Sequence, residues 1–425
     1  MNKPLPPEVA LKARLMLLDT VGCMLAARSA PEVLQLEATL ARVERGSFCF
    51  PGGKPLSLLG AAAVGAMSAT WDEACEGLAL AHGRPGVPVV AALLPYAVMN
   101  GMTLGALVKS VVTGYEAGAR AGAWLRIKPG MHVDGNWPAL GVAAAMGDAL
   151  DLSDEVRKTA LDIVACQLPT SLYLPVASGA TARNTYLPHS AWLGILAATS
   201  ADAGVSAPHD ALPHYAERFS AAGAQEVIPD DRFLILDAYF KPHAAVRHVH
   251  YGAEAARVIR ARLKSGTRSI IAIRLRIYRE AITYCGNRDP RTPIQGQFSL
   301  SFGIAAALLH GGIEANVYRP ESFNEAELRR LEALVTVEVD EALTAASKRG
   351  ATLTVEAGGE TFEQRVDAIT GDPESPMAKE DVFAKFVRYA SPCVGRQRAE
   401  RFADELLAAQ PDVKVSGLWD SLSSG

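Results

Sequence analysis

The first half of the chain carries apolar residues at helical spacing. Over residues 11–27, for example, Leu15, Leu18 and Val21 recur at intervals of three and lie on one helix face. Similar segments follow one another, with short breaks, up to about residue 205. Many of them are rich in Ala and Gly, so neighbouring helices can approach closely. The pattern predicts a compact helical body.

One uncharged stretch, residues 85–108, resembles a membrane span in its hydropathy. Pro88 and Pro95 interrupt it, and charged residues continue the same helical pattern afterwards. A helix that is apolar on all sides can instead lie at the centre of a large protein. We therefore expect two buried helices, at about 87–98 and 103–123, and no membrane segment.

The pattern changes near residue 268, where apolar and polar side chains begin to alternate. Such alternation is typical of a strand with one buried face. We predict a strand over residues 268–278 whose buried face carries four apolar side chains: Ile271, Ile273, Leu275 and Ile277.

Three further segments show strand-like patterns, at residues 335–340, 352–356 and 361–366. The last two flank a Gly-Gly pair at 358–359, and paired glycines favour the tight turn of a hairpin. This part of the chain is therefore expected to form a small sheet with intervening helices.

Helical periodicity returns near the C-terminus, at residues 378–390 and 397–409. The sheet-forming segment thus interrupts a helical one. We predict a mainly α fold with an α+β insert. Its large all-helical domain would comprise residues 1–250 and 385–425, and its smaller α+β lid domain residues 251–384.

Composition narrows the classes to which the protein can belong. With 425 residues, 49% of them hydrophobic, the chain can bury a core, which excludes a disordered protein. The formal charge of −4 is too balanced for a nucleic-acid-binding surface. The six cysteines form no Cys-x-x-Cys pair, which argues against structural zinc or a disulfide scaffold. The first residues lack an apolar signal-peptide core, so we expect a cytoplasmic location.

Polar side chains gather in several segments that are otherwise apolar or rich in Gly and Pro. The first, residues 71–86, contains Glu76, His82 and Arg84 and ends in a Gly/Pro loop. Loops on a rigid scaffold often carry functional groups. A solvated acidic helix end followed by a turn explains the same residues equally well.

A second polar loop, residues 129–138, holds His132, Asp134 and Asn136 ahead of a buried helix. The N-terminus of a helix favours an anion, so a substrate carboxylate could bind here. Alternatively, Asp134 and Asn136 only cap the helix that follows.

Two more polar segments point to carboxylate binding less directly. Residues 178–189 place Arg183 beside Asn184, and the planar guanidinium of Arg suits bidentate carboxylate binding. A simple surface loop is the alternative. Residues 288–302 include Gln297 and lead into an apolar helix, where helix capping is the alternative.

The densest polar segment is residues 239–250. It places five cationic or titratable side chains among apolar neighbours: Lys241, His243, Arg247, His248 and His250. No carboxylate or thiol accompanies the histidines, and their spacing matches no standard zinc pattern. An anionic-substrate site with a histidine acting as acid or base is the preferred interpretation.

Seven segments resemble motifs of one enzyme family. They are Asp19-Thr-Val-Gly-Cys, Arg84-Pro-Gly-Val-Pro-Val-Val, Thr113-Gly-Tyr-Glu, Gly179-Ala-Thr-Ala-Arg-Asn, Lys241-Pro-His-Ala-Ala-Val-Arg-His-Val-His, Gln297-Phe-Ser-Leu-Ser-Phe and Gly371-Asp-Pro-Glu-Ser-Pro. In this order, over nearly the whole chain, they identify it as a divergent member of the MmgE/PrpD family. That family includes 2-methylcitrate dehydratases, cis-aconitate decarboxylases and iminodisuccinate epimerases.

The resemblance implies a large helical domain built from both chain ends, a smaller α+β lid, a cleft between them and a homodimer. It also implies proton chemistry next to a carboxylate, without a metal or another cofactor. The reaction would be the dehydration, decarboxylation or epimerisation of a small di- or tricarboxylate.

Departures from the family motifs point to a divergent substrate. Arg84 stands where the family's first loop has His, and His82 lies two residues earlier. Trp137 stands where the second loop has His, which leaves His132 as the nearby histidine. The family's acidic pair is best matched by the Cys-Glu pair at 75–76.

These residues give a first assignment of roles. His132 or His250 would act as the base, and His82 as the acid or a second base. Three cations would hold the substrate carboxylates and the enediolate-like charge, with Lys241 also part of the catalytic set: Arg183, Lys241 and Arg247. Further substrate contacts are expected from Glu76, Arg84, Asn136, Asn184 and Gln297.

Two other functions remain as alternatives. The first is a metal-dependent hydrolase that uses the cluster of His243, His248 and His250. The second is a carboxylate-binding protein without catalysis, because two family histidines are replaced.

Overall fold

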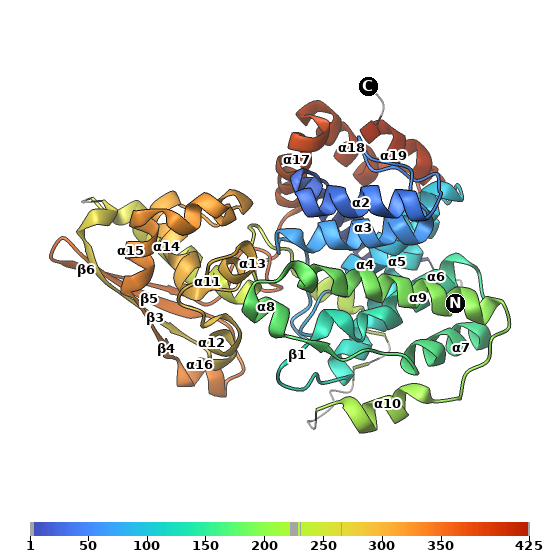
Figure 1. Ribbon diagram of the computed structural model, residues 1–425, viewed down its shortest axis with the longest axis horizontal. Coiled ribbons are helices and arrows are strands. Elements are labelled where there is room, and N and C mark those ends of the chain that lie inside the picture. Colours follow the sequence, from blue (N-terminus) through green and yellow to red (C-terminus); the bar gives the residue numbers. More distant parts are fainter. Residues whose placement is uncertain (1–3, 222–227, 230, 265, 424–425) are drawn as a thin grey trace.

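The computed structural model describes residues 4–221, 228–229, 231–264 and 266–423. Within these residues the protein is mainly α-helical, with a four-stranded sheet in an α+β part. Figure 1 shows the α+β part beside the helical body. The mainly α fold with an α+β insert, predicted from the sequence, is confirmed.

Both ends of the chain contribute to the helical body. The N-terminal half forms α1 (Pro7–Ala26), α2 (Pro31–Val43), α3 (Leu58–Trp71), α4 (Gly86–Met99), α5 (Leu104–Trp124), α6 (Pro138–Ala149), α7 (Asp154–Ala165), α8 (Leu174–Ser178), α9 (Tyr186–Asp202) and α10 (Ala211–Phe219). A short antiparallel pair, β1 (Met131–His132) and β2 (Ser171–Leu172), lies within the same half. The C-terminal end forms α17 (Lys379–Val394), α18 (Arg396–Ala408) and α19 (Val415–Ser423).

The two buried helices predicted from the uncharged stretch are α4 and α5. Pro95 lies inside α4, whose side chains are buried on nearly all sides. No helix in the described part of the chain is long and apolar enough to cross a membrane. α4 packs against α3, α5, α6 and α9, so the apolar stretch lies inside the helical body.

Glycines let α5 and α6 approach each other closely. A Cβ atom added at Gly114 would lie 2.7 Å from the carbonyl oxygen of Gly141, and one added at Gly141 would lie 2.8 Å from that of Gly114. Larger side chains would therefore push the two backbones apart. This confirms the close helix packing expected from the Ala- and Gly-rich segments.

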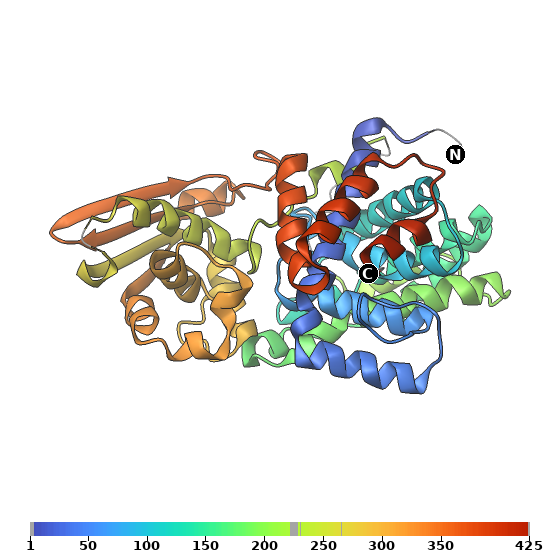
Figure 2. The same ribbon diagram turned by 90° about the horizontal axis from the view of Figure 1, so that it is seen from above.

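The α+β part follows α10 in the chain. Its elements are α11 (Arg247–Arg262), β3 (Ile270–Ile277), α12 (Arg279–Cys285), α13 (Pro293–Gln297), α14 (Leu300–His310), α15 (Ala326–Leu334), β4 (Val335–Val339), α16 (Glu341–Ala345), β5 (Ala351–Ala357) and β6 (Glu360–Val366). The strand order is β4-β3-β5-β6, with β3 parallel to β4 and antiparallel to β5. α11, α14 and α15 pack against this sheet, and Figure 2 shows them on one side of it.

The predicted buried face of β3 is correct except at its first position. Ile273, Leu275 and Ile277 are buried, but Ile271 is 68% exposed. The pairing register with β5 shifts between Ile270 and Ala272. Such an irregularity moves the following side chains to the other face of the strand, so Ile270 is buried in place of Ile271.

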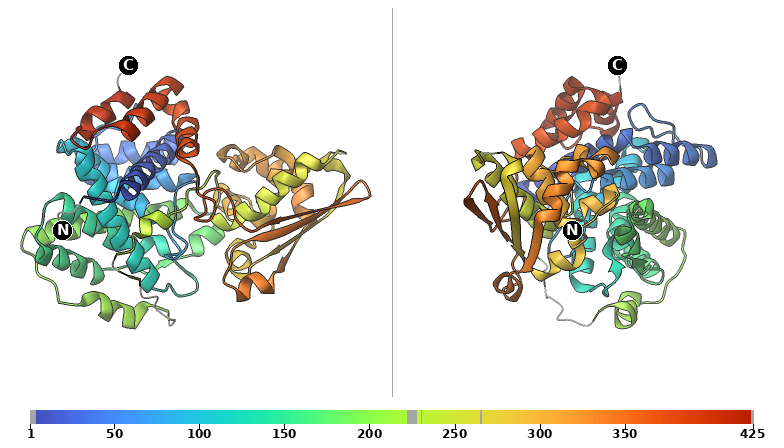
Figure 3. Two further views of the ribbon diagram at one scale, coloured as in Figure 1. Left: turned by 180° about the vertical axis from the view of Figure 1, so that it is seen from behind. Right: turned by 60° about the vertical axis from the view of Figure 1, so that its left-hand side comes forward.

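The two chain ends are joined by a buried ion pair. Lys385 of α17 donates to the Asp19 carboxylate of α1 and, at 2.7 Å, to the Ala74 carbonyl oxygen. α1 packs along α17, and Figure 3 shows the C-terminal helices resting on the N-terminal ones. This ion pair therefore connects α17, the first helix after the α+β part, to α1 of the helical body.

The predicted domain limits both fall inside helices. Residue 250 lies in α11 (Arg247–Arg262), and residue 385 lies in α17 (Lys379–Val394). The two-domain division and the dimeric state stay predictions.

The Asp19–Lys385 pair gives a test of what joins the chain ends. Both side chains are at most 2% exposed, so replacing one leaves the other charge buried and unpaired. We expect Lys385→Met or Asp19→Asn to lower the free energy of unfolding by about 3–5 kcal/mol in urea denaturation. The exposed Lys379→Met in the same helix should change it by less than about 0.5 kcal/mol. Equal effects at Lys379 and Lys385 would show that the pair does not stabilise the junction.

Candidate active site

A cavity of about 280 Å³ lies where the helical body meets the α+β part. Among the residues predicted to be functional, five line it: His82, Arg84, His132, Lys241 and Arg247. The other predicted residues are not among its lining: Glu76, Asn136, Arg183, Asn184, His250 and Gln297. The cavity therefore brings together about half of the predicted site.

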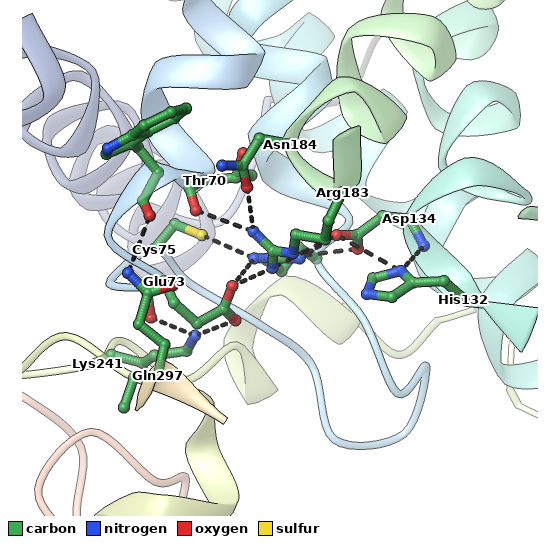
Figure 4. Close-up of polar contacts among 12 residues, drawn as sticks. Thr70, Glu73, Cys75, His132, Asp134, Arg183, Asn184, Lys241 and Gln297 are labelled. Carbon is green, nitrogen blue, oxygen red and sulfur yellow. Dashed lines mark hydrogen bonds and ion pairs between the residues drawn. The ribbon is translucent and has the colours of Figure 1, made fainter. Parts of the chain in front are cut away.

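The carboxylate of Glu73 is the centre of the charged groups around the cavity. Lys241 Nζ donates to Glu73 Oε1 at 2.9 Å and to the Glu73 carbonyl oxygen at 2.7 Å. Arg84 Nη1 donates to Glu73 Oε2 at 2.8 Å, and Arg183 donates to the same oxygen. Figure 4 shows the Glu73 carboxylate between Lys241 and the guanidinium of Arg183. One buried acid thus holds three cations from distant segments.

The three cations determine the ionisation of Glu73. Burial alone would raise the pKa of this carboxyl, but Arg183, Arg84 and Lys241 hold it well below the ordinary value. Glu73 also has a left-handed backbone, with φ of 53°. A non-glycine residue in this conformation costs free energy, which the surrounding ion pairs offset.

Asp134 supplies the second buried acid. Its carboxylate accepts hydrogen bonds from Arg84 Nη2 and, at 3.4 Å, from Arg84 Nε. The guanidinium of Arg84 therefore lies between two carboxylates, those of Asp134 and Glu73. Arg84 therefore bridges these two acids.

Arg183 does not line the cavity and is held by hydrogen bonds to neighbouring protein groups. Its Nη1 donates to the Thr70 carbonyl oxygen at 3.0 Å and to Asn184 Oδ1 at 2.8 Å. Asn184 therefore orients Arg183. The prediction that both residues contact a substrate directly does not fit their positions outside the cavity lining.

His132 has a defined tautomer. Its Nδ1 accepts a hydrogen bond of 3.2 Å from the Asp134 backbone N–H, so the proton of the neutral ring lies on Nε2. Burial lowers the pKa of His132 to about 4, so the ring is neutral near neutral pH. Nε2 makes no hydrogen bond in the described part of the chain. A neutral imidazole of this kind presents an N–H donor to the cavity.

Trp137 fills space beside the cavity. Trp137 is fully buried, and a Cβ atom added at Gly83 or Gly122 would lie 2.6 Å from its ring. These two glycines make room for the indole. Trp137 therefore packs behind Gly83 and Gly122, two residues that line the cavity, and is not itself part of the lining.

Arg247 pairs with an acid of the α+β part. Its Nε and Nη2 donate to Asp372 Oδ1 at 3.0 and 2.6 Å, and its guanidinium lies over the Tyr239 ring. Tyr251 donates to the other carboxylate oxygen of Asp372 at 3.0 Å. The predicted substrate cation Arg247 is thus paired through Nε and Nη2, whereas its Nη1 has no hydrogen-bond partner in the described residues.

His82 and Glu280 meet at the rim of the cavity. His82 lies in the body, with a left-handed φ of 53°, and its Nδ1 is 3.3 Å from Glu280 Oε1 of α12. The hydrogen bond with His82 lowers the pKa of Glu280 to about 2. The contact joins the body to the α+β part.

His250 lies away from the cavity. Its Nε2 donates to the Ala245 carbonyl oxygen at 3.1 Å, and the Ala245 backbone is strained, with φ of 134°. His250 therefore stabilises the turn between Lys241 and Arg247. The prediction of His250 as a base does not fit this position.

Three other predicted substrate contacts are occupied by the protein itself. Glu76 Oε1 accepts the backbone N–H groups of Gly86 and Val87, at 2.8 and 3.2 Å, at the start of α4. Asn136 donates to the Pro169 carbonyl oxygen and to the Tyr215 hydroxyl, both at 2.7 Å. Gln297 donates to the Trp71 carbonyl oxygen at 3.1 Å. Each stabilises a loop or a helix end.

The three histidines of the alternative metal site do not converge. His243 Nδ1 pairs with Glu314 Oε1 at 2.6 Å, His248 Nδ1 with the Tyr278 hydroxyl, and His250 with a backbone carbonyl. The described residues contain no group of three potential metal ligands. Neighbours two positions apart on a helix point in different directions, so His248 and His250 cannot bind one ion together.

Sequence reasoning missed several lining residues. Glu73 and Asp134 lie in two of the predicted polar segments, residues 71–86 and 129–138. Their role as counter-ions of buried cations is visible only in the folded protein. Arg126, Glu280 and Arg349 belong to segments without a motif. These lining residues can be recognised only in the folded protein, where a charged side chain is seen to be half-buried at the cavity.

The fold is thus that of a mainly α protein with a charged cavity beside an α+β part, and comparisons with known proteins identify its family. The family model described as the MmgE/PrpD N-terminal domain matches residues 2–222. The model of the MmgE/PrpD C-terminal domain matches residues 243–409. The protein therefore belongs to the MmgE/PrpD family, and this membership supports a lyase-type function in broad terms. No curated protein matches the chain.

The buried Glu76 gives a pH-dependent prediction. Burial raises its pKa from 4.5 to about 8, so the folded protein holds this proton more tightly than the unfolded chain. The contribution of Glu76 to the free energy of unfolding should fall as pH rises between these values, by at most about 1.4 kcal/mol per pH unit. Glu76→Gln keeps a side-chain oxygen that can accept the backbone N–H groups, but it does not titrate. The free energy of unfolding of this variant, relative to the wild type, should therefore increase with pH.

Urea denaturation across this pH range measures the difference. Glu155→Gln, at an exposed position in the first turn of α7, is the matched control. For Glu155→Gln, the difference in free energy of unfolding from the wild type should not depend on pH. If the difference for Glu76→Gln is also the same at every pH, Glu76 is ionised in the folded protein and the prediction is wrong.

Proposed function

We propose that the protein is a lyase or isomerase that removes a proton from the carbon next to a carboxylate of a small di- or tricarboxylate. The reaction would be a dehydration, a decarboxylation or an epimerisation. The observation that carries the proposal is the neutral His132, whose Nε2–H is free beside a cavity with excess positive charge.

The charge of the cavity supports an anionic substrate. Five Lys or Arg side chains and three Asp or Glu side chains line it, an excess of two positive charges when the histidines are left out of the count. Arg183 and Asp372, which pair with lining residues from outside, cancel each other. An excess of two charges is complementary to a dianion.

Lys241 is suited to hold a substrate carboxylate even though it pairs with Glu73. An ammonium group has three N–H donors, and Glu73 accepts two of them. The third has no acceptor in the described residues, and Lys241 lines the cavity. A carboxylate there would gain a charge-assisted hydrogen bond.

His132 and His248 have different roles in this proposal: His132 donates a hydrogen bond and His248 accepts the proton. The Nε2–H of His132 would stabilise the negative charge that develops on the carboxylate, as an oxyanion donor does. His248 also lines the cavity, and its Nδ1 pairs with the Tyr278 hydroxyl. With Nδ1 donating to that oxygen, Nε2 carries a lone pair and would accept the substrate proton.

Exchange of substrate protons with solvent tests the proposal. We expect NMR in deuterated water to detect α-proton exchange in at least one small di- or tricarboxylate. His132→Ala should slow this exchange about hundredfold or more while the protein stays folded. His132→Gln, which keeps an N–H donor, should retain more activity than His132→Ala.

His189→Gln is the matched control, because His189 is an exposed histidine of α9 outside the cavity. It should exchange the α-proton at the wild-type rate. Binding of carboxylates without any exchange in the wild type would instead favour a binding protein without catalysis.

A further inference from the structure

Arg349 is a cation of the α+β part that reaches the cavity. It lies in the loop between α16 and β5 and is half-buried. No side chain or carbonyl group in the described part of the chain accepts a hydrogen bond from it, and no carboxylate there lies within 4.0 Å of its guanidinium. No motif in the sequence marks this residue.

The loop that carries Arg349 has a defined shape. Ser347 has a left-handed φ of 51°, and the Lys348 N–H donates to the Leu343 carbonyl oxygen at 3.0 Å. Gly350 has a φ of 156°, and a Cβ atom there would lie 3.0 Å from the Val366 carbonyl oxygen. The backbone on both sides of Arg349 is thus constrained, which holds its side chain at the cavity.

The other cations of the cavity are occupied to different degrees. Arg84 and Lys241 pair with Glu73, and Arg247 pairs with Asp372. Arg126 donates only to the Leu80 carbonyl oxygen, at 3.4 Å. Within the described residues, Arg126 and Arg349 are therefore the lining cations without a carboxylate partner, and they match the excess of two positive charges.

We propose that Arg349 is the anchor for the second carboxylate of the ligand and selects dianionic ligands over monoanionic ones. The ligand class rests on the function proposed above. The first carboxylate would lie near His132 and Lys241 on the body wall, and Arg349 would bind the other from the opposite part of the chain. Binding would then join the body to the α+β part through the ligand itself.

This arrangement also couples binding to the proposed base. Burial is the main reason that the pKa of His248 falls to about 3, and the charge of Arg349 lowers it further. A carboxylate paired with Arg349 would neutralise that charge and make His248 a better proton acceptor. Glu280, the nearby acid at the rim, pairs with His82; its charge also acts on Arg349, but no hydrogen bond or ion pair within 4.0 Å joins the two.

Calorimetric titration with matched probes tests the anchor. The dianions malonate and succinate are compared with their monoamides, malonamate and succinamate, near neutral pH and at low salt. We expect the wild type to prefer each dianion by about tenfold or more, the effect of one charge-assisted contact. Arg349→Met should abolish this preference, and Arg349→Lys should retain part of it because the charge remains.

Lys348→Met is the matched control, because Lys348 is exposed in the same loop and does not line the cavity. It should keep the wild-type preference. A wild type that binds no dianion better than its monoamide, or an Arg349→Met variant with an unchanged preference, would overturn the proposal.

The same variants separate this proposal from the proposed reaction. If Arg349 determines the dianion preference but no α-proton exchanges, the anchor stands and the reaction is wrong. If exchange occurs and Arg349→Met leaves both the preference and the KM unchanged, the reaction stands and the anchor is wrong.

Discussion

The buried carboxylate of Glu73 is the interaction on which the site depends. Three cations from separate segments, at residues 84, 183 and 241, converge on its two oxygens. A cation in such a buried place is costly unless a carboxylate lies within hydrogen-bonding distance. The loop after α3, the turn before α9 and the loop before α11 therefore have to meet at one point, and the cavity forms beside it.

This pairing changes the role of the predicted substrate cations. Protein acceptors already hold Arg183 and Arg247, although Nε of Arg183 and Nη1 of Arg247 have no partner in the described residues. They keep the cavity walls in place before any ligand arrives, which reduces the cost of reorganisation on binding. In the proposed function, an anion would use lining donors that have no acceptor in the described residues, on His132, Lys241, Arg126, Arg349 and Nη1 of Arg247.

Arg84 and Trp137, at the two positions where the sequence predicts departures from the family motifs, lie in and beside the cavity. Arg84 links Glu73 to Asp134, and Trp137 packs against Gly83 and Gly122. Arg84 thus acts as a charged bridge, whereas Trp137 packs behind two glycines that line the cavity.

Local patterns in the sequence determined the helices of the body, the strands of the α+β part and the segments that carry the site. Helical and strand periodicities report burial along a single element, so α4, α5 and most of β3 followed from them. The exposed Ile271 did not follow, because the register shift depends on the neighbouring strand β5.

Only the tertiary structure decided which polar residues face the cavity. His250 and Glu76 turn to backbone groups, whereas Arg349, which no motif marks, reaches the site from a distant loop. The reason is physical: a side chain's partner is set by contacts between segments far apart in the chain, and no local spacing encodes them.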